Sequence, residues 1–179
     1  RGQCILDYGY MDADKKWFLL MSGSMGFGHI QDTVKEILRK CGDSVEVILV
    51  CGNNTELRER LQKNFRHNEN VVALGFTDKI PNLMDACDVL FTKPGGLSST
   101  EAAAKHIPII HTAPIPGCET MNALFFHYHG LSYATTDIHE QVRQALLLCD
   151  DPERRTRMIA AQTANINPGT CRDITELLK

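Results

Sequence analysis

The stretch "FTKPGGLSSTEAAAKHIPII", residues 91–110, decides the fold class that this sequence predicts. An apolar run typical of a buried strand leads into two glycines and a group of hydroxyl side chains. A helical pattern follows, and it carries a single glutamate, Glu101. Glycines between a strand and a helix let backbone N–H groups approach an anion at the helix start. The stretch therefore predicts a strand, a ligand-binding turn and a helix of a parallel α/β sheet.

The same alternation runs along the rest of the chain. Short apolar runs rich in β-branched and aromatic residues predict strands at 17–21, 45–50, 71–74, 89–92 and 107–111. Amphipathic stretches predict helices at 30–41, 55–65, 80–86, 99–105, 119–129 and 138–149, one that starts at Asp151-Pro152, and a short one after 168–169. The predicted fold class is α/β, a doubly wound parallel sheet of the Rossmann-like kind.

Composition limits the possible functions. The 179 residues suit one domain, and 43% hydrophobic with 23% charged residues is ordinary for a globular protein. The net charge of -3 speaks against nucleic acid as a partner, because nucleic-acid-binding domains are usually basic. No apolar run approaches the roughly 20 residues that span a bilayer. Seven cysteines without CxxC spacing indicate a reduced, cytoplasmic chain.

The first sixteen residues lack periodicity until the apolar run that begins at Trp17. We expect residues 1–16 to be a linker from an N-terminal domain that this sequence does not contain, and residues 17–179 to form the folded domain. A processed natural N-terminus is the alternative.

Three loops follow predicted strands and are the candidate binding elements. The first, 22–29, places Gly23, Gly26 and Gly28 in a G-x-x-G-x-G pattern, which is neither the dinucleotide fingerprint nor a P-loop. Such a loop suits an anion at the start of the following helix. A tight turn without a ligand is the alternative.

The second loop contains Gly95 and Gly96, and Ser98 or Ser99 is expected to cap the next helix. A helix start of this kind suits a phosphate. Glu101 is then expected in the first helical turn, where its carboxylate can accept hydrogen bonds from a ribose diol. Helix capping alone is the alternative.

The third loop leads to Glu119 and Asn122, which are three residues apart and share a helix face. Both can bond sugar hydroxyls, and capping is again the alternative. His127 and His129 are two apart, so we interpret them as surface histidines rather than metal ligands. His29 and His111 lie near the predicted cleft, where either can contact a phosphate.

With all three loops in order, the chain resembles the C-terminal domain of glycosyltransferase family 28. "GFTDKIPNLMDACDVLFTKPGGLSSTEAAAKHIPII" (75–110) and "PIPGCETMNALFF" (114–126) carry the resemblance, which covers about 17–178. The diacylglycerol glycosyltransferases and monogalactosyldiacylglycerol synthases are the most similar branch. The resemblance implies the C-terminal half of a GT-B enzyme that binds a UDP-sugar and needs no metal or other cofactor.

The resemblance also implies site residues. Ser24, Met25 and Gly26 would line the diphosphate and base side, and Gly75 and Phe76 would bind uracil. The diphosphate would lie against Gly95, Gly96, Leu97, Ser98 and Ser99, the ribose against Glu101, and the hexose against Gly117, Glu119 and Asn122. Cys118 departs from the family, which often has glutamine there, and this leaves the identity of the hexose open.

The implied function is donor binding in an inverting hexosyltransferase that glycosylates a membrane lipid, diacylglycerol. The missing domain would bind the lipid acceptor and supply the base, so no catalytic residue is expected in this domain. The full-length protein would lie on the cytoplasmic face of the membrane. One alternative is a non-catalytic donor-binding subunit of a split enzyme. A nucleotide-dependent oxidoreductase is disfavoured, because "VCGNN" (50–54) lacks the acid that ends the second strand of that class.

Overall fold

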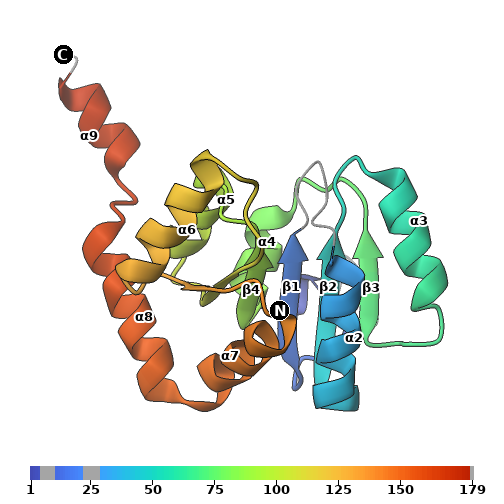
Figure 1. Cartoon of the computed structure of the whole chain (residues 1–179). Helices are drawn as coiled ribbons and strands as arrows, with labels where there is room; N and C mark the ends of the chain where they lie inside the picture. Colours follow the sequence, from blue (N-terminus) through green and yellow to red (C-terminus); the bar gives the residue numbers. More distant parts are fainter. Residues whose placement is uncertain (5–10, 22–28, 178–179) are drawn as a thin grey trace.

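The computed structural model describes residues 1–4, 11–21 and 29–177. Six parallel strands form one sheet in the order β3-β2-β1-β4-β5-β6 (Figure 1). The strands are β1 (Lys16–Met21), β2 (Val45–Val50), β3 (Val71–Leu74), β4 (Val89–Thr92), β5 (Ile109–His111) and β6 (Tyr133–Ala134). This arrangement confirms the predicted parallel, doubly wound fold.

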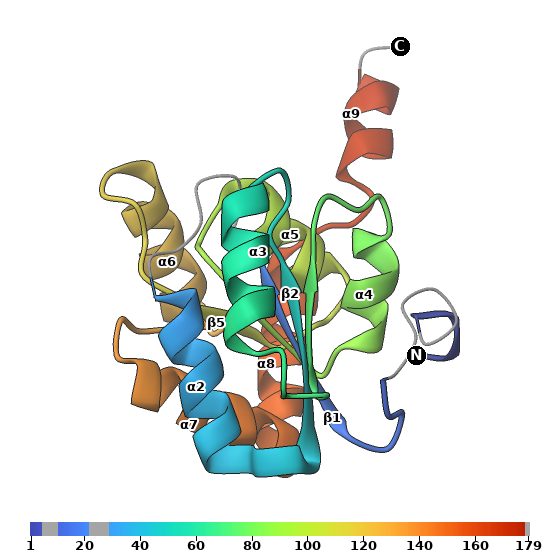
Figure 2. The same ribbon diagram turned by 90° about the vertical axis from the view of Figure 1, so that its right-hand side faces the viewer.

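Helices cover both faces of the sheet. Figure 2 shows α2 and α7 on one side and α4 with the N-terminal residues on the other. The described helices are α2 (Ile30–Cys41), the 3-10 turn η1 (Gly42–Ser44), α3 (Thr55–Asn64), α4 (Ile80–Ala86), α5 (Gly96–Ala104), α6 (Cys118–Tyr128), α7 (Ile138–Asp150), α8 (Pro152–Asn165) and α9 (Thr170–Leu177). None of the helices within these ranges is long and apolar enough to span a bilayer.

The central strand β1 shows why the sheet needs helices on both faces. Phe18 and Leu20 are fully buried in the cluster beneath α2, α3 and α7, whereas Trp17 and Leu19 are buried in the cluster on the α4 and α5 side. Successive side chains of a strand point to opposite faces, so a strand with apolar side chains on both faces must be covered on both.

The strand order reverses next to β1, which lies between β2 and β4. Met21, at the end of β1, pairs with Val50 of β2 and Thr92 of β4. In open α/β sheets, ligands bind at the carboxyl ends of the strands at such a reversal. The loop after β1 begins there, but Ser24, Met25 and Gly26 lie outside the described residues, and their predicted roles stay predictions.

Most predicted element bounds agree with the structure within one residue at either end. α8 begins as predicted, because the Asp151 carboxylate accepts hydrogen bonds from the N–H groups of Glu153 and Arg154. Three predictions were wrong. The fifth strand begins at Ile109 and not at residue 107, the two-residue strand β6 was missed, and α5 begins three residues earlier than expected, directly after Gly95.

The described part of residues 1–16 packs against the domain. Cys4 and Met11 are buried in the core cluster on the α4 side. The Arg1 guanidinium donates to the carbonyl of Ala86 at 3.0 Å and pairs with Asp88. Two apolar side chains and one cation of this segment therefore find partners on the domain. A preceding domain remains a prediction.

Candidate functional site

The start of α5 is an open helix N-terminus of the kind that suits an anion. Gly95 is the N-cap residue and has extended backbone angles, φ −75° and ψ 143°. The Ser99 N–H donates back to the Gly95 carbonyl at 3.2 Å, whereas the N–H groups of Gly96, Leu97 and Ser98 meet no backbone acceptor among the described residues. A Cβ atom at Gly95 or Gly96 would meet nothing within 4 Å. Donors without a backbone partner in the described part of the chain, at a positive helix end with space before them, suit a phosphate group.

Ser99 lies behind this position and not in it, which corrects two expectations. Its side chain is fully buried, and its hydroxyl lies 2.9 Å from Nε2 of His111. It therefore neither caps α5 nor points a polar group at a ligand. Ser98, the other expected cap, makes no capping hydrogen bond either.

His111 is a core residue and does not face a phosphate, contrary to expectation. Its ring bridges two hydroxyls, Ser99 through Nε2 and Ser132 through Nδ1 at 3.0 Å. Its ring centroid also lies 5.3 Å from that of Phe126 in α6. Burial, with a smaller contribution from His127, lowers the pKa of His111 to about 4. The neutral ring thus joins the starts of α5 and β6 from inside the core.

Glu101 is the sixth residue of α5, so the prediction that it lies in the first turn was wrong. It is exposed, and the helix has no acidic residue in its first turn. Leu97 and Ser98 precede it by four and three residues and therefore share its helix face. No hydrogen bond or ion pair joins its carboxylate to another described residue. The geometry removes the capping alternative and leaves a free acceptor beside the open helix start.

A second feature lies at the carboxyl ends of β1 and β2. A cavity of about 270 Å³ is lined by Met21, Val50, Gly52, Asn53, Phe76, Thr77 and Ile80. Its walls are mainly apolar, and Phe76 is 75% exposed. An exposed aromatic ring beside an apolar hollow suits a flat heterocycle. The predicted uracil position at Gly75-Phe76 therefore borders a cavity of suitable character.

The start of α6 differs because its polar side chains already have partners. Glu119 pairs with Lys93 through Oε1 at 2.8 Å and accepts from the Ile115 N–H through Oε2 at 2.7 Å. Burial raises the pKa of Glu119, but the Lys93 ammonium and the Ile115 N–H outweigh it, and the pKa lies below its usual value. Each carboxylate oxygen keeps a second acceptor position. A hydrogen bond to a hexose is therefore compatible with this geometry and stays a prediction.

Asn122 and Gly117 also serve the architecture of this loop. The Asn122 side-chain amide donates to the Pro94 carbonyl at 3.0 Å, which ties α6 to the loop before α5. Gly117 has φ 109°, a conformation that side chains disfavour, so a glycine is needed there whatever binds. The predicted hexose residues thus lie beside the open start of α5 and hold the two loops together.

Sequence reasoning missed a second group of polar residues at this edge. Thr112 directly follows β5, and Gln141 lies in α7. Both line a cavity of about 290 Å³ together with His29 and Lys93. The position of Thr112 at a strand end was a usable signal, whereas Gln141 lies in an ordinary helical pattern that gives none.

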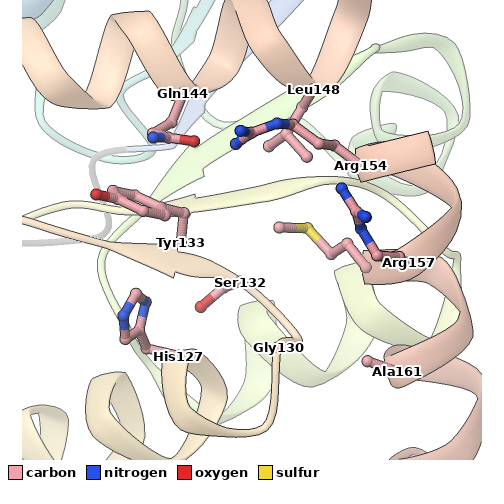
Figure 3. Close-up of a pocket in the computed structure, with 10 residues that line it drawn as sticks. His127, Gly130, Ser132, Tyr133, Gln144, Leu148, Arg154, Arg157 and Ala161 are labelled. Atoms are coloured by element: carbon pink, nitrogen blue, oxygen red, sulfur yellow. The ribbon is translucent and has the colours of Figure 1, made fainter. Parts of the chain in front are cut away.

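A further cavity, of about 310 Å³, lies at the β6 edge of the sheet, and its lining includes no residue of the three predicted loops (Figure 3). Arg154 and Arg157 of α8 extend along one side of it, and the Tyr133 ring and His127 lie on the other. The His127 Nδ1 atom accepts from the Ala134 N–H at 3.2 Å. His127 therefore supports β6, and within the described ranges no group of three His, Cys, Asp or Glu side chains is placed to hold a metal ion.

These features define a Rossmann-like domain with an open helix start next to its switch point. The chain belongs to the family described as glycosyl transferases group 1, whose model matches residues 12–164. It is 34% identical over 173 residues to the processive diacylglycerol beta-glucosyltransferase of Staphylococcus aureus (strain Newman). The match covers 94% of this chain but 44% of that relative, so the chain spans less than half of the relative's length. The predicted resemblance to diacylglycerol glycosyltransferases is thereby confirmed.

Solved structures share the fold. MurG of Acinetobacter baumannii matches 91% of this chain and 49% of its own, with a TM-score of 0.71 and 19% identity. HepE of Anabaena in complex with UDP-glucose matches 91% of this chain and 46% of its own, with a TM-score of 0.69 and 20% identity. A UDP-GlcNAc 2-epimerase from Neisseria meningitidis matches 99% of this chain and 47% of its own, with a TM-score of 0.73 and 16% identity. At these identities the likeness establishes the fold alone, here one half of a GT-B architecture.

Proposed function

We propose that this chain is the donor-binding domain of an inverting hexosyltransferase that takes a UDP-sugar and glycosylates a membrane lipid, diacylglycerol. The observation that carries the proposal is the open start of α5, where the N–H groups of Gly96, Leu97 and Ser98 have no backbone acceptor in the described part of the chain and lie beside an exposed Glu101. The family match and the diacylglycerol glucosyltransferase relative support the reaction class.

The order of the apolar cavity and the open helix start along the sheet edge supports a UDP-sugar as the donor. The apolar cavity beside Phe76 lies at the ends of β1 and β2, and the free N–H groups follow β4, the neighbour of β1 on its other side. A base in the cavity and a diphosphate at α5 place the ribose between them, where Glu101 accepts from its hydroxyls. The complex of HepE with UDP-glucose, on the same fold, supports a UDP-sugar ligand.

In this account the domain contributes to the transfer by stabilising the leaving group. Negative charge builds on the diphosphate as the bond to the sugar breaks, and fixed N–H dipoles at a helix start stabilise that charge without rearrangement. We propose no metal and no other cofactor for this step. The acceptor hydroxyl attacks from the opposite face, and its proton goes to a base in the preceding domain.

The lipid acceptor is proposed from the relative's name, and the membrane surface follows from it. Helix α6 exposes Met121, Leu124, Phe125 and Tyr128, which recur at helical spacing on one face. An exposed apolar helix face is typical of proteins that lie on a bilayer surface. We place the full-length enzyme peripherally on the cytoplasmic face.

A non-catalytic donor-binding subunit of a split enzyme is the second candidate. Both candidates require nucleotide binding. Calorimetric titration with UDP, ADP and NAD tests this shared requirement. We expect UDP to bind in preference to the other two, and a preference for NAD, or no binding of UDP at millimolar concentration, would reject the proposal.

A transfer assay tests where the base lies. Incubated with diacylglycerol vesicles and radiolabelled UDP-glucose or UDP-galactose, this chain alone should give no glycolipid, because acceptor positioning and proton removal are both missing. Turnover above the buffer blank would show that the chain carries its own base, with His29 as the exposed candidate.

A further inference from the structure

The cavity at the β6 edge of the sheet (Figure 3) carries positive charge. It measures about 310 Å³, within the range of about 300–1,000 Å³ for small-molecule pockets. Its lining comes from the end of α6, from β6 and from the helices α7 and α8, which pack against each other. The lining includes Arg154, Arg157 and His127, and none of its described residues is acidic. The whole chain has a net charge of -3, so this hollow departs from the overall charge balance.

The two arginines lie close together without an anion between them. Arg154 and Arg157 are three residues apart in α8 and therefore share one helix face. Figure 3 shows both side chains along the same side of the cavity. Arg157 makes no hydrogen bond or ion pair with a described residue, whereas Arg154 uses its Nε atom, which lies 3.2 Å from the Asp151 carboxylate. Like charges at this spacing repel, so an anion that contacts both guanidinium groups would relieve the repulsion.

The nearby carboxylates already have other partners. Asp151 accepts from two backbone N–H groups at the start of α8. Glu140 in α7 accepts from the Arg143 guanidinium through both oxygen atoms at 2.7 Å, and from the hydroxyl of the lining residue Tyr133 at 2.9 Å. A concave surface with cationic side chains and no free carboxylate attracts an anion from outside the chain.

The rest of the lining adds one neutral donor and apolar surface. The His127 Nδ1 atom accepts from the Ala134 N–H, so the neutral ring carries its proton on Nε2 and can donate from there. Leu148, Met158 and the Tyr133 ring supply apolar contact. A ligand that fits this lining therefore combines an anionic group with a small apolar portion.

The number of donors favours phosphate over carboxylate. Guanidinium groups bind both anions through paired hydrogen bonds. A phosphate monoester presents three acceptor oxygens and a charge of roughly −1.5 to −2, which matches two guanidinium groups and one ring N–H better than a carboxylate does. We propose that this cavity binds the phosphate group of a phosphate monoester, with Arg154 and Arg157 as its main contacts. Both a soluble molecule and the headgroup of an anionic lipid present this group.

The site is independent of the proposed function, because its lining includes no residue of the three predicted loops. Titration of the ¹⁵N-labelled chain with glycerol 3-phosphate at constant ionic strength tests it, and glycerol is the uncharged control ligand. The backbone amides of Gly130 and Tyr133 report on the cavity. Arg157→Gln removes the charge and the paired donors without breaking a contact to a described residue.

Arg60→Gln is the matched control variant. Arg60 is also an exposed arginine without a hydrogen bond to a described residue, but it lies in α3, which packs beside β3 at the other edge of the sheet. The two variants therefore have the same net charge and differ in the site that they alter.

We expect glycerol 3-phosphate to shift the Gly130 and Tyr133 amides saturably. Its dissociation constant should rise about tenfold in Arg157→Gln, as for the loss of charge-assisted hydrogen bonds, and stay unchanged in Arg60→Gln. Cavity amides that do not shift, or that shift equally with glycerol, would overturn the proposal. An equal loss of affinity in both variants would also overturn it, because net charge alone would then explain the binding.

Vesicle sedimentation distinguishes the two sources of the phosphate group. Phosphatidylcholine vesicles with phosphatidic acid present the monoester on a lipid, and pure phosphatidylcholine vesicles control for apolar adsorption. Sedimentation that requires phosphatidic acid and is lost in Arg157→Gln but not in Arg60→Gln would identify a lipid headgroup as the ligand. Saturable binding of glycerol 3-phosphate without such sedimentation would identify a soluble monoester. Either result supports the phosphate site.

Discussion

The starts of α5 and α6 lie side by side at the carboxyl edge of the sheet, yet they are built differently. At α5, three backbone N–H groups and the Glu101 carboxylate have no partner among the described residues. At α6, Glu119 is held by Lys93 and by the Ile115 N–H, and Asn122 donates to the Pro94 carbonyl. One helix start is open to a ligand, and the other holds the two loops in place.

This difference teaches that residue types at a loop do not reveal how far their hydrogen-bonding capacity is already used. Both loops combine glycine with polar residues, and both were predicted to bind the donor directly. Fixed partners at α6 keep the position of the α5 loop defined while its donors stay free. Pre-organisation of this kind lowers the entropic cost of binding.

The largest expected effect concerns His111, which contacts α5 through Ser99 and α6 through Phe126. Its pKa is about 4 in the folded chain and about 6.5 when unfolded, so the unfolded chain binds the proton first as the pH falls. The stability that depends on neutral His111 is complete above pH 6.5 and is lost towards pH 4, by roughly 3 kcal/mol. Urea unfolding at pH 7 and pH 4.5 measures the loss.

His111→Gln is the matched variant, since it keeps a polar side chain but cannot titrate in this range. Its stability should vary less with pH than that of the unsubstituted chain. Equal pH dependence of both chains would contradict the buried, neutral state of His111.

The next effect concerns Glu101 at the open helix start. Glu101→Ala should weaken UDP binding by about 1.5–3 kcal/mol, as for the loss of a charge-assisted acceptor. The melting temperature should stay unchanged, because the exposed Glu101 caps no helix. Glu153→Ala, an exposed acid in the first turn of α8, controls for the change in net charge. Unchanged UDP affinity of Glu101→Ala would remove the ribose contact from the account.

The smallest effect concerns the Lys93–Glu119 pair. Lys93→Met should cost about 1 kcal/mol of stability, because the pair is only partly buried and the Ile115 N–H remains. Since the folded-state pKa of Glu119 is lowered, its contribution is present above the usual carboxyl pKa and is lost as the pH falls through the folded value. The melting temperatures of the unsubstituted chain and the Lys93→Met variant should therefore lie closer together at pH 3 than at pH 7. A constant difference at both pH values would show that Lys93 acts through packing instead.

Much of the fold could be predicted, because local signals and tertiary packing agree. β2 and α2 have the predicted bounds, since β2 is apolar at every position except Glu46 and α2 has a helical apolar period. Strand β6 was missed because two residues, Tyr133 and Ala134, carry no periodicity, and only pairing with β5 makes them a strand. The start of α5 was misplaced because serine usually caps a helix, whereas Ser99 here bonds a histidine twelve residues away.

The sequence predicted where the candidate site lies in the fold, but not which side chains contact one another there. Gly95 and Gly96 lie at the turn from β4 into α5 as the motif predicted, because strand ends and helix starts fix backbone positions, whereas Glu101 lies beyond the first helical turn in which it was predicted. The partners of Glu119 and the free oxygens of Thr112 and Gln141 depend on side chains from separate elements, and no local pattern encodes those contacts.

The central claim is that the free N–H groups at the start of α5 receive the diphosphate of a uridine nucleotide. Titration of the ¹⁵N-labelled chain with UDP, followed through backbone amide shifts, tests it most directly. We predict large shifts for Gly96, Leu97 and Ser98, with much smaller shifts at Arg154 and Arg157 beside the separate cavity at the β6 edge. Saturable UDP binding that leaves these three amides unmoved would contradict the account.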